Sequence, residues 1–258
     1  MDDGHAAAPD GPAPLGPGWR RPVVGVLGGL GPLASAVFQR RTVELTAADR
    51  DQDHLDMVVL THSSTPDRTA RILDAGAADP GPVLRADAEL LARLGCEVIA
   101  VPCNTAQAFL RGEFADGLGV PLLDIVAVAA QEAAQRAGDT GAVGILATSG
   151  TLASGIYQDA LAVHGARAVL TDEAEQAEVM RVIYEQVKAG LPGDAGAVLD
   201  LADALRDRGA GAVVLGCTEL SVVYADADLR GHPHLVDGLE TLARRTLVLA
   251  GAPLRGGA

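Results

Sequence analysis

The sequence predicts an α/β protein made of two pseudo-symmetric, doubly wound domains with parallel sheets and a ligand site in the cleft between them. Short apolar runs alternate with longer Ala- and Leu-rich stretches of helical length, which is typical of an α/β fold. The runs are apolar at every position, as expected for parallel strands buried on both faces. In addition, two segments of the first half recur, in the same order, in the second half. A length of 258 residues suits one large domain or two small ones.

Composition excludes several classes of function. The chain carries 20 Lys and Arg against 34 Asp and Glu, a net charge of -14, which argues against binding to nucleic acid or an anionic membrane. No apolar run reaches the length of a membrane span. Residues 1–20 are rich in Ala, Pro and Gly and lack a secretory signal pattern, so we expect a flexible tail on a cytoplasmic protein. Three scattered cysteines fit neither a disulfide scaffold nor a zinc site, and we expect reduced thiols and no metal.

The elements of the first half can be placed by apolar runs and by glycine or proline at their ends. Pro32 suits the first turn of a helix, and Gly95 suits a helix end. We predict strands at Val23–Leu27, Met57–Leu60 and Val98–Val101, and helices from Pro32, over Pro82–Leu94 and from about Thr105.

An internal repeat indicates duplication. Val24–Ser35 aligns without gaps on Val143–Ser154, with seven identities in twelve positions. Gly95–Cys103 has a counterpart in Gly209–Cys217, each with a glycine, an apolar strand and a cysteine eight residues after the glycine. We therefore expect a first domain over 21–120, a second over 121–233, and a C-terminal segment, 234–258, that packs back on the first.

The repeat also predicts a pair of opposed thiols. Ligands of α/β sheets bind beyond the carboxyl ends of the strands, so two facing halves would bring Cys103 and Cys217 to one cleft. Each cysteine precedes the expected start of a helix, where backbone N–H groups stabilise thiolates and substrate carboxylates. Cys96 has no equivalent in the repeat and is expected to be a small buried hydrophobe.

Two facing thiols suit the inversion of a carbon that carries an acidic hydrogen. One thiolate removes the proton from one face, and the opposite thiol returns a proton to the other face. The two cysteines would then titrate as a coupled pair.

Four motifs in order resemble those of the PLP-independent aspartate/glutamate racemases, most closely the aspartate racemase branch. They are Gly28–Ala34, Pro66–Thr69, Pro102–Ala106 and Gly216–Glu219. The resemblance extends from about Val23 to Leu239. It implies two similar α/β domains with the active site between them, an acidic amino acid as substrate, no cofactor and a homodimer.

The resemblance also implies roles for individual residues. Cys103 and Cys217 would be the two acid/base groups, and Arg68 and Lys188 would bind the side-chain carboxylate, for which a guanidinium is well suited. Asn104, Thr105 and Thr218 would hold the α-carboxylate, with help from a four-residue loop made of Thr148, Ser149, Gly150 and Thr151. Leu30 and Glu219, within the first and last motifs, would also contact the substrate.

Two positions depart from the family pattern and leave the substrate open. Gln107 stands where the family usually has a histidine, and glutamine cannot carry a proton or a charge. Thr61–Thr65 replaces an Asn-rich run that lies near the expected substrate loop. His62 within it could be a replacement polar contact, although a surface or loop histidine is the more common case.

Three alternatives have to be weighed. Gly29–Ala34 fits a dinucleotide-binding pattern, but no acidic residue follows the second strand to bind a ribose. Glutamate racemase, maleate isomerase and hydantoin racemase relatives also use two cysteines. A non-catalytic ligand-binding protein with the same fold would bind ligand without turnover.

Overall fold

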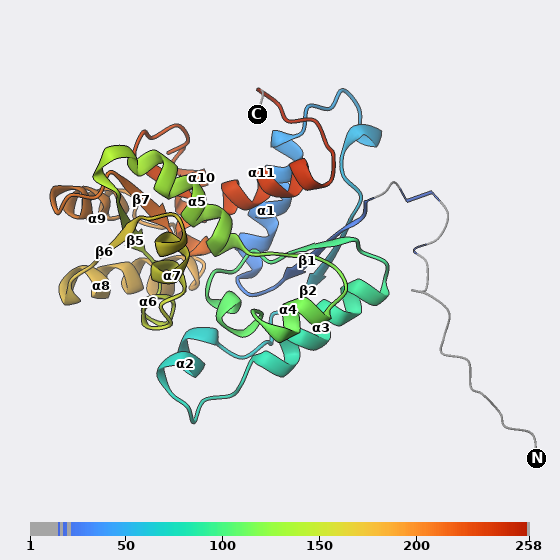
Figure 1. Ribbon diagram of the computed structural model, residues 1–258, viewed down its shortest axis with the longest axis horizontal. Helices are drawn as coiled ribbons and strands as arrows, with labels where there is room; N and C mark the ends of the chain where they lie inside the picture. Colours follow the sequence, from blue (N-terminus) through green and yellow to red (C-terminus); the bar gives the residue numbers. More distant parts are fainter. Residues whose placement is uncertain (1–14, 16–17, 20–21, 257–258) are drawn as a thin grey trace, which may run out of the picture.

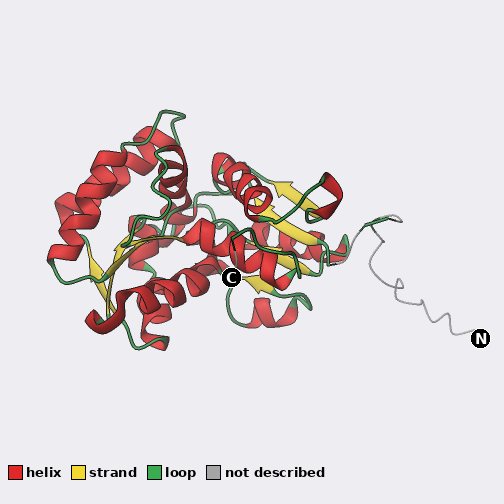
Figure 2. Ribbon diagram, turned by 90° about the horizontal axis from the view of Figure 1, so that it is seen from above, coloured by secondary structure: helices red, strands yellow, loops and turns green. Residues whose placement is uncertain are grey.

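The computed structural model describes residue 15, residues 18–19 and residues 22–256; most of the expected N-terminal tail lies outside the described residues. Eight strands form two separate four-stranded sheets, ordered β2-β1-β3-β4 and β6-β5-β7-β8, with every pairing parallel (Figures 1 and 2). The strands are β1 (Val24–Gly28), β2 (Met57–Thr61), β3 (Val98–Ala100), β4 (Leu122–Leu123), β5 (Ala142–Leu146), β6 (Arg167–Leu170), β7 (Ala212–Leu215) and β8 (Leu235–Asp237).

The helices flank these sheets and connect their parallel strands. They are α1 (Pro32–Leu45), α2 (Arg68–Leu73), α3 (Gly81–Arg93), α4 (Glu113–Gly117), α5 (Ile125–Ala137), α6 (Ser149–Ala153), α7 (Ile156–Val163), α8 (Glu173–Met180), α9 (Ala195–Asp207), α10 (Thr218–Asp226) and α11 (Gly238–Leu249). Shorter 3₁₀ segments lie at Asp51–Asp53, Thr105–Phe109 and Gly138–Thr140, and a π-helix, Arg181–Val187, continues α8. The predicted α/β class with two parallel sheets is confirmed.

Alternation along β1 shows why its sequence is apolar throughout. Val24 and Val26 join a buried cluster with Phe38 of α1, whereas Val23 and Leu27 join a second cluster on the other side of the sheet. Successive side chains of a strand point to opposite faces, so a strand covered on both faces has no position left for a polar residue. The three predicted strands lie within a residue or two of their expected bounds, and the helix begins at Pro32 as predicted.

The internal repeat corresponds to equivalent strands. Of the two aligned valines, Val24 is the first residue of β1 and Val143 is the second residue of β5. The two strands occupy the same place in their respective sheets. A third equivalence follows from the structure, because Asp124 after β4 and Asp237 at the end of β8 both cap the next helix through their side chains. Duplication of one α/β unit accounts for all three matches.

The division of strands between the two sheets differs slightly from the residue ranges predicted for the two domains. β4 lies beyond residue 120 but pairs with β3, so the first sheet ends at Leu123. β8 falls within the C-terminal segment, yet it pairs with β7 of the second sheet. After β8 the chain packs along α1 through α11, and Arg255 donates its backbone N–H to Leu45 at 2.7 Å.

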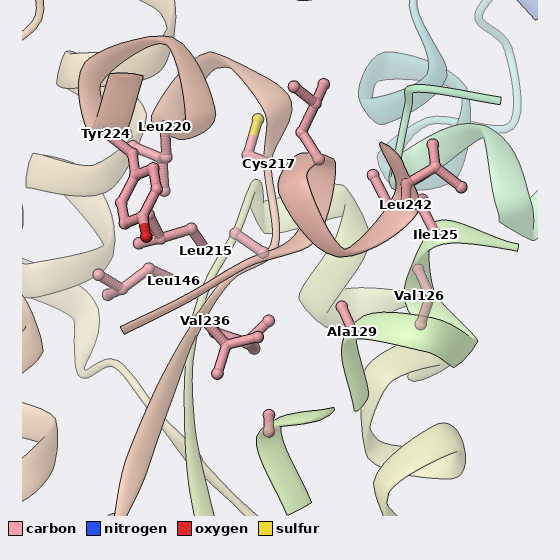
Figure 3. Packing of buried hydrophobic residues seen from close by; sticks show 14 of the residues in the cluster. Ile125, Val126, Ala129, Leu146, Leu215, Cys217, Leu220, Tyr224, Val236 and Leu242 are labelled. Carbon is pink, nitrogen blue, oxygen red and sulfur yellow. The ribbon is translucent and has the colours of Figure 1, made fainter. Parts of the chain in front are cut away.

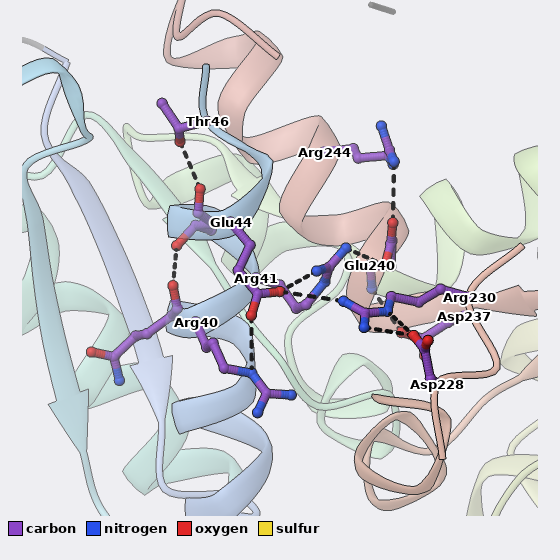
Figure 4. Close-up of polar contacts among 11 residues, drawn as sticks. Arg40, Arg41, Glu44, Thr46, Asp228, Arg230, Asp237, Glu240 and Arg244 are labelled. Carbon is purple, nitrogen blue, oxygen red and sulfur yellow. Dashed lines mark hydrogen bonds and ion pairs between the residues drawn. The ribbon is translucent and has the colours of Figure 1, made fainter. Parts of the chain in front are cut away.

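Ion pairs fasten α11 to α1 (Figure 4). The Arg41 guanidinium, only 8% exposed, lies 2.8 Å from Glu240 of α11 and also contacts Glu44 within its own helix. Arg230 reaches Glu44 at 3.7 Å from the loop before β8. A buried guanidinium with two carboxylate partners fixes α11 on α1 more firmly than exposed pairs would.

Candidate active site

Cys103 and Cys217 occupy equivalent places in the two domains. Cys103 follows β3 and Cys217 follows β7, the strands that have the same position in their sheets, and each is 5% exposed. Both cysteines line one cavity at the domain boundary. The prediction that duplication brings two thiols to one cleft is met by this geometry. Cys96 is buried elsewhere, against Gly25 of β1.

The backbone after the two cysteines is less symmetric than the sequence suggests. After Cys217 the chain enters α10 directly, as predicted. After Cys103 a helix begins at Thr105, as predicted, but it is the short 3₁₀ segment Thr105–Phe109 and not an α-helix. This segment ends with Leu110 as its C-cap, and Gly112, with a φ of 68°, directly precedes α4.

The cavity is small and strongly polar. Its volume is about 20 Å³, which is room for one water molecule. A neighbouring hollow of about 470 Å³ shares Asp67, Arg68, Lys188 and Glu219 with it. Residues that line the cavity are Leu30, Asp67, Arg68, Thr69, Cys103, Asn104, Thr105, Thr148, Tyr184, Lys188, Cys217, Thr218 and Glu219.

Ten of the residues singled out in the sequence line this cavity, whereas Ser149, Gly150 and Thr151 do not. The backbone N–H of Ser149 points to the Met180 sulfur at 3.3 Å, and Gly150 lies against Thr69. Thr151 is fully buried behind the cavity wall. The expected carboxylate loop therefore contributes only Thr148 to the lining.

Sequence reasoning missed Asp67, Thr69 and Tyr184. Asp67 and Thr69 belong to the Pro66–Thr69 motif, so the signal was present but only its arginine was used. Tyr184 lies four residues before Lys188, a spacing that places two side chains on one helix face, and the Lys188 Nζ lies 5.2 Å from the centre of its ring.

Glu219 connects the lysine to one of the thiols. Its Oε1 lies 3.0 Å from Lys188 Nζ, and its Oε2 accepts a hydrogen bond from Cys217 Sγ, also at 3.0 Å. Burial, and then the charge of Glu219, raise the pKa of the Cys217 thiol well above its ordinary value. Figure 3 shows the hydrophobic packing around Cys217, with Leu215 and Leu220 close by along the chain. Cys217 is therefore a thiol at neutral pH in the free protein.

Lys188 remains an ammonium despite its position. Burial alone would lower its pKa, but the negative charge of Glu219, 3.0 Å away, is the largest of the opposing effects, and the pKa is raised above the ordinary value. The cavity thus contains a permanent cation within reach of a bound anion.

Two buried N–H donors on the cavity wall have no hydrogen-bond partner among the described residues. Asn104 accepts from the Tyr157 hydroxyl at 2.7 Å through Oδ1, which leaves its Nδ2 unpaired. The Arg68 guanidinium donates to the carbonyls of Leu30 at 2.8 Å and Pro66 at 3.0 Å, but its Nε is unpaired. Buried donors without partners are costly, so both predict a ligand rich in acceptors.

A cluster of hydroxyl groups joins the two domains beside the cavity. Thr151 Oγ1 lies 2.8 Å from that of Thr105 and 3.0 Å from that of Thr148, and Thr69 donates to Thr148 at 3.1 Å. Thr69 and Thr105 come from the first domain, and the other two come from α6 of the second. The cluster therefore links the two domains beside the cavity.

The departures from the family pattern lie outside the cavity. Nδ1 of His62 lies 2.8 Å from Asp87 of α3, so this histidine contacts its own domain. Gln107 is 2% exposed, and its Nε2 has no partner in the described part of the chain. Neither side chain is among the lining residues.

The glycine-rich loop has a packing role. Gly29 has a φ of 87°, and a Cβ at this position would lie 2.4 Å from the backbone nitrogen of His62. The glycine therefore permits close approach of two backbone segments, which explains the dinucleotide-like pattern without a bound nucleotide. Among the described residues no cluster of three or more His, Cys, Asp or Glu could hold a metal ion.

Comparison with known proteins gives the family. The profile of the Asp/Glu/hydantoin racemases matches residues 27–246, most of the chain. The chain belongs to this family. The racemase profile covers both domains, both cysteines and every lining residue of the cavity.

Individual racemases agree with this assignment. A glutamate racemase of Deinococcus radiodurans is 33% identical over 178 residues, 67% of this chain and 60% of that protein. The broad-specificity amino-acid racemase RacX of Bacillus subtilis is 30% identical over 60% of this chain and 67% of its own length. The aspartate racemase of Picrophilus torridus has the same fold, with a TM-score of 0.72 at 24% identity over 90% of this chain and 96% of its own.

The helices carry no sign of a membrane span. Within the described part of the chain, none is both long enough and apolar enough to cross a bilayer.

Proposed function

We propose that this protein interconverts L- and D-aspartate, or a closely related acidic amino acid, without a cofactor. The observation that carries the proposal is that two thiols from equivalent strands, Cys103 and Cys217, line a single cavity with an arginine and a lysine. A thiol on each side of a bound Cα is what inversion by two bases requires.

Proton transfer in this scheme is balanced. One thiolate takes the Cα proton as that C–H bond breaks, and the opposite thiol gives its proton to the other face as the new C–H bond forms. The two cysteines thereby exchange protonation states, and the next turnover in the same direction requires them to reset. The raised pKa of Cys217 supports its role as the thiol that donates in the free enzyme.

Negative charge develops on the α-carboxylate as the Cα proton leaves, and the cavity supplies donors for substrate carboxylates. The unpaired Nδ2 of Asn104 and Nε of Arg68 are preorganised, because their other polar atoms are already hydrogen-bonded within the protein. Lys188 adds a charge that does not depend on pH in the neutral range. Asn104, Arg68 and Lys188 come from three different elements of the fold, which supports a substrate with two separate carboxylates.

A cavity of about 20 Å³ is too small for an amino acid, so the proposal requires substrate to occupy the neighbouring hollow as well, which shares Arg68 and Lys188 with the cavity. The hollow also favours a second candidate, a racemase for longer side chains such as glutamate, since its 470 Å³ adjoins Arg68 and Lys188. Dimerisation stays a prediction, and analytical ultracentrifugation would test it.

Proton NMR of the purified protein with L-aspartate in D₂O, followed by chiral analysis, tests the proposal. We expect loss of the Cα–H signal together with formation of D-aspartate, without added PLP or metal. C103S and C217S should each lose nearly all racemisation, whereas C96S, a matched change at a buried cysteine outside the cavity, should retain it. Exchange absent with aspartate but present with glutamate would favour the second candidate, and exchange absent with both would contradict the racemase proposal.

A further inference from the structure

The charged groups of the cavity are not fully paired with one another. Lys188 and Glu219 form an ion pair, and Glu219 is also occupied by the Cys217 thiol. Arg68 and Asp67, adjacent in sequence, make no ion pair with each other or with another charged group among the described residues. The cavity therefore presents one guanidinium and one carboxylate whose charges no group among residues 22–256 neutralises.

Asp67 retains acceptor capacity toward the cavity. Its Oδ1 caps α2 by accepting from the Ala70 N–H at 2.8 Å, and its Oδ2 lies 3.3 Å from the Tyr184 hydroxyl. A carboxylate offers about four lone-pair sites, so these two contacts leave room for further donors. Asp67 is half-buried and lines both the cavity and the adjoining hollow.

An uncompensated cation beside an uncompensated anion is the complement of a zwitterion. Substrate carboxylates satisfy Arg68 and Lys188, but an α-amino acid also brings an ammonium group. Glu219 already has two partners, so Asp67 is the lining carboxylate that remains free for a cation. A dicarboxylate without an amino group would place only negative charge against Asp67.

We propose that Asp67 binds the α-ammonium group of the substrate and thereby selects amino acids over dicarboxylates that lack nitrogen. The inference rests on the proposed racemase function, and it identifies Asp67 as a specificity-determining residue. Tyr184 acts as a positioning residue, because its hydroxyl contacts the same carboxylate. Maleate-type substrates are disfavoured by this arrangement.

Aspartate and succinate form the matched ligand pair for the test, since succinate lacks only the amino group. Asp67→Asn is the matched variant, because asparagine caps a helix as well as aspartate does and removes only the charge. Asp194→Asn is the control, since Asp194 caps α9 through the same kind of contact, 3.0 Å to the Ala197 N–H, away from the cavity. Titration calorimetry of each protein with each ligand gives the dissociation constants.

We expect wild type and D194N to bind aspartate more tightly than succinate. D67N should bind aspartate about tenfold more weakly or worse, as expected for loss of a charged hydrogen bond. Its affinity for succinate should be unchanged or higher, because the repelling carboxylate is gone. Equal losses for both ligands, no loss for aspartate, or a wild-type protein without preference for aspartate would overturn the inference.

Calorimetry together with the NMR exchange experiment separates this inference from the proposed function. Wild type that prefers aspartate in binding but shows no Cα–H exchange would contradict the racemase proposal and leave the ammonium site standing. Wild type that racemises aspartate while D67N keeps its preference for aspartate would contradict only the role of Asp67.

Discussion

Glu219 accepts a hydrogen bond from the thiol of Cys217, two residues before it, with 3.0 Å between Oε2 and Sγ. The same carboxylate lies 3.0 Å from Lys188 Nζ, so one buried acid contacts both a thiol and a cation of the cavity. This arrangement holds Cys217 protonated and keeps Lys188 from pairing directly with its sulfur.

Glu219→Gln should lower the pKa of Cys217. Burial, the largest cause of the raised pKa, stays the same, but the negative charge that opposes the thiolate is removed and Lys188 loses its carboxylate partner. Ultraviolet absorbance of the thiolate during a pH titration measures this, in a C96S/C103S background that leaves one cysteine. Lys188→Met should shift the titration in the opposite direction. A higher Cys217 pKa in the glutamine variant would contradict the contact between the Glu219 carboxylate and the Cys217 thiol.

Thr151→Val should lower the free energy of unfolding, because it removes hydroxyl bonds at the boundary between the two domains. Thr151 is fully buried, and valine removes its hydroxyl bonds to Thr105 and Thr148, which costs about 1–3 kcal/mol. Urea unfolding measures the loss. Thr246→Val is the matched control, because Thr246 is also fully buried but, within the described part of the chain, its hydroxyl bonds only to a carbonyl of its own helix, that of Leu242. Equal losses in the two variants would mean that the hydroxyl cluster adds nothing specific.

Gly150→Ala should separate α2 from α6. An added Cβ would lie 2.8 Å from the Thr69 Cα and 2.9 Å from its Oγ1, contacts too short to keep without backbone movement. We expect a loss of about 1–3 kcal/mol in stability, and weaker aspartate binding because Thr69 and Thr148 line the cavity. Gly117→Ala is the control, since a Cβ there meets nothing within 4 Å. Unchanged stability and binding in G150A would show that the domain boundary is not close-packed.

The sheets and the cysteine pair could be predicted because each depends on a short-range pattern. A strand buried on both faces is apolar at every position, and duplication copies that pattern. The equivalence of Cys103 and Cys217 is therefore visible in the amino-acid sequence. The site follows because parallel strands end at one edge of a sheet.

Contacts that depend on the meeting of the two domains could not be predicted in the same way. Tyr184 and Lys188 reach the cavity from the π-helix Arg181–Val187 and its end, and such a widened turn has no clear sequence signal. Burial of Thr151 depends on how closely Gly150 approaches Thr69, which is a tertiary contact. The helix expected after Cys103 is a five-residue 3₁₀ segment with Leu110 as its C-cap, and the short-range pattern of apolar residues does not distinguish such a turn from the start of an α-helix.

Asp237 should make stability depend on pH in a defined direction. It is buried at the end of β8, where it accepts from the Ser221 hydroxyl and, at 3.0 Å, from the Glu240 N–H. Burial outweighs these bonds and raises its pKa from 3.8 to about 6. The folded state therefore holds a proton that the unfolded state releases between these two values, so this contribution is fully present below pH 3.8 and is lost as pH rises through about 6.

The difference in unfolding free energy between wild type and Asp237→Asn isolates this effect, because asparagine does not titrate. We expect the unfolding free energy of wild type to fall by about 3 kcal/mol relative to that of the variant between about pH 4 and 6. Above that range the difference should not change further. Ser221→Ala should move the window to higher pH, since it removes a hydrogen bond that favours the carboxylate. A difference that stays constant from about pH 4 to 7 would contradict the raised pKa, and a difference that grows in favour of wild type would reverse its sign.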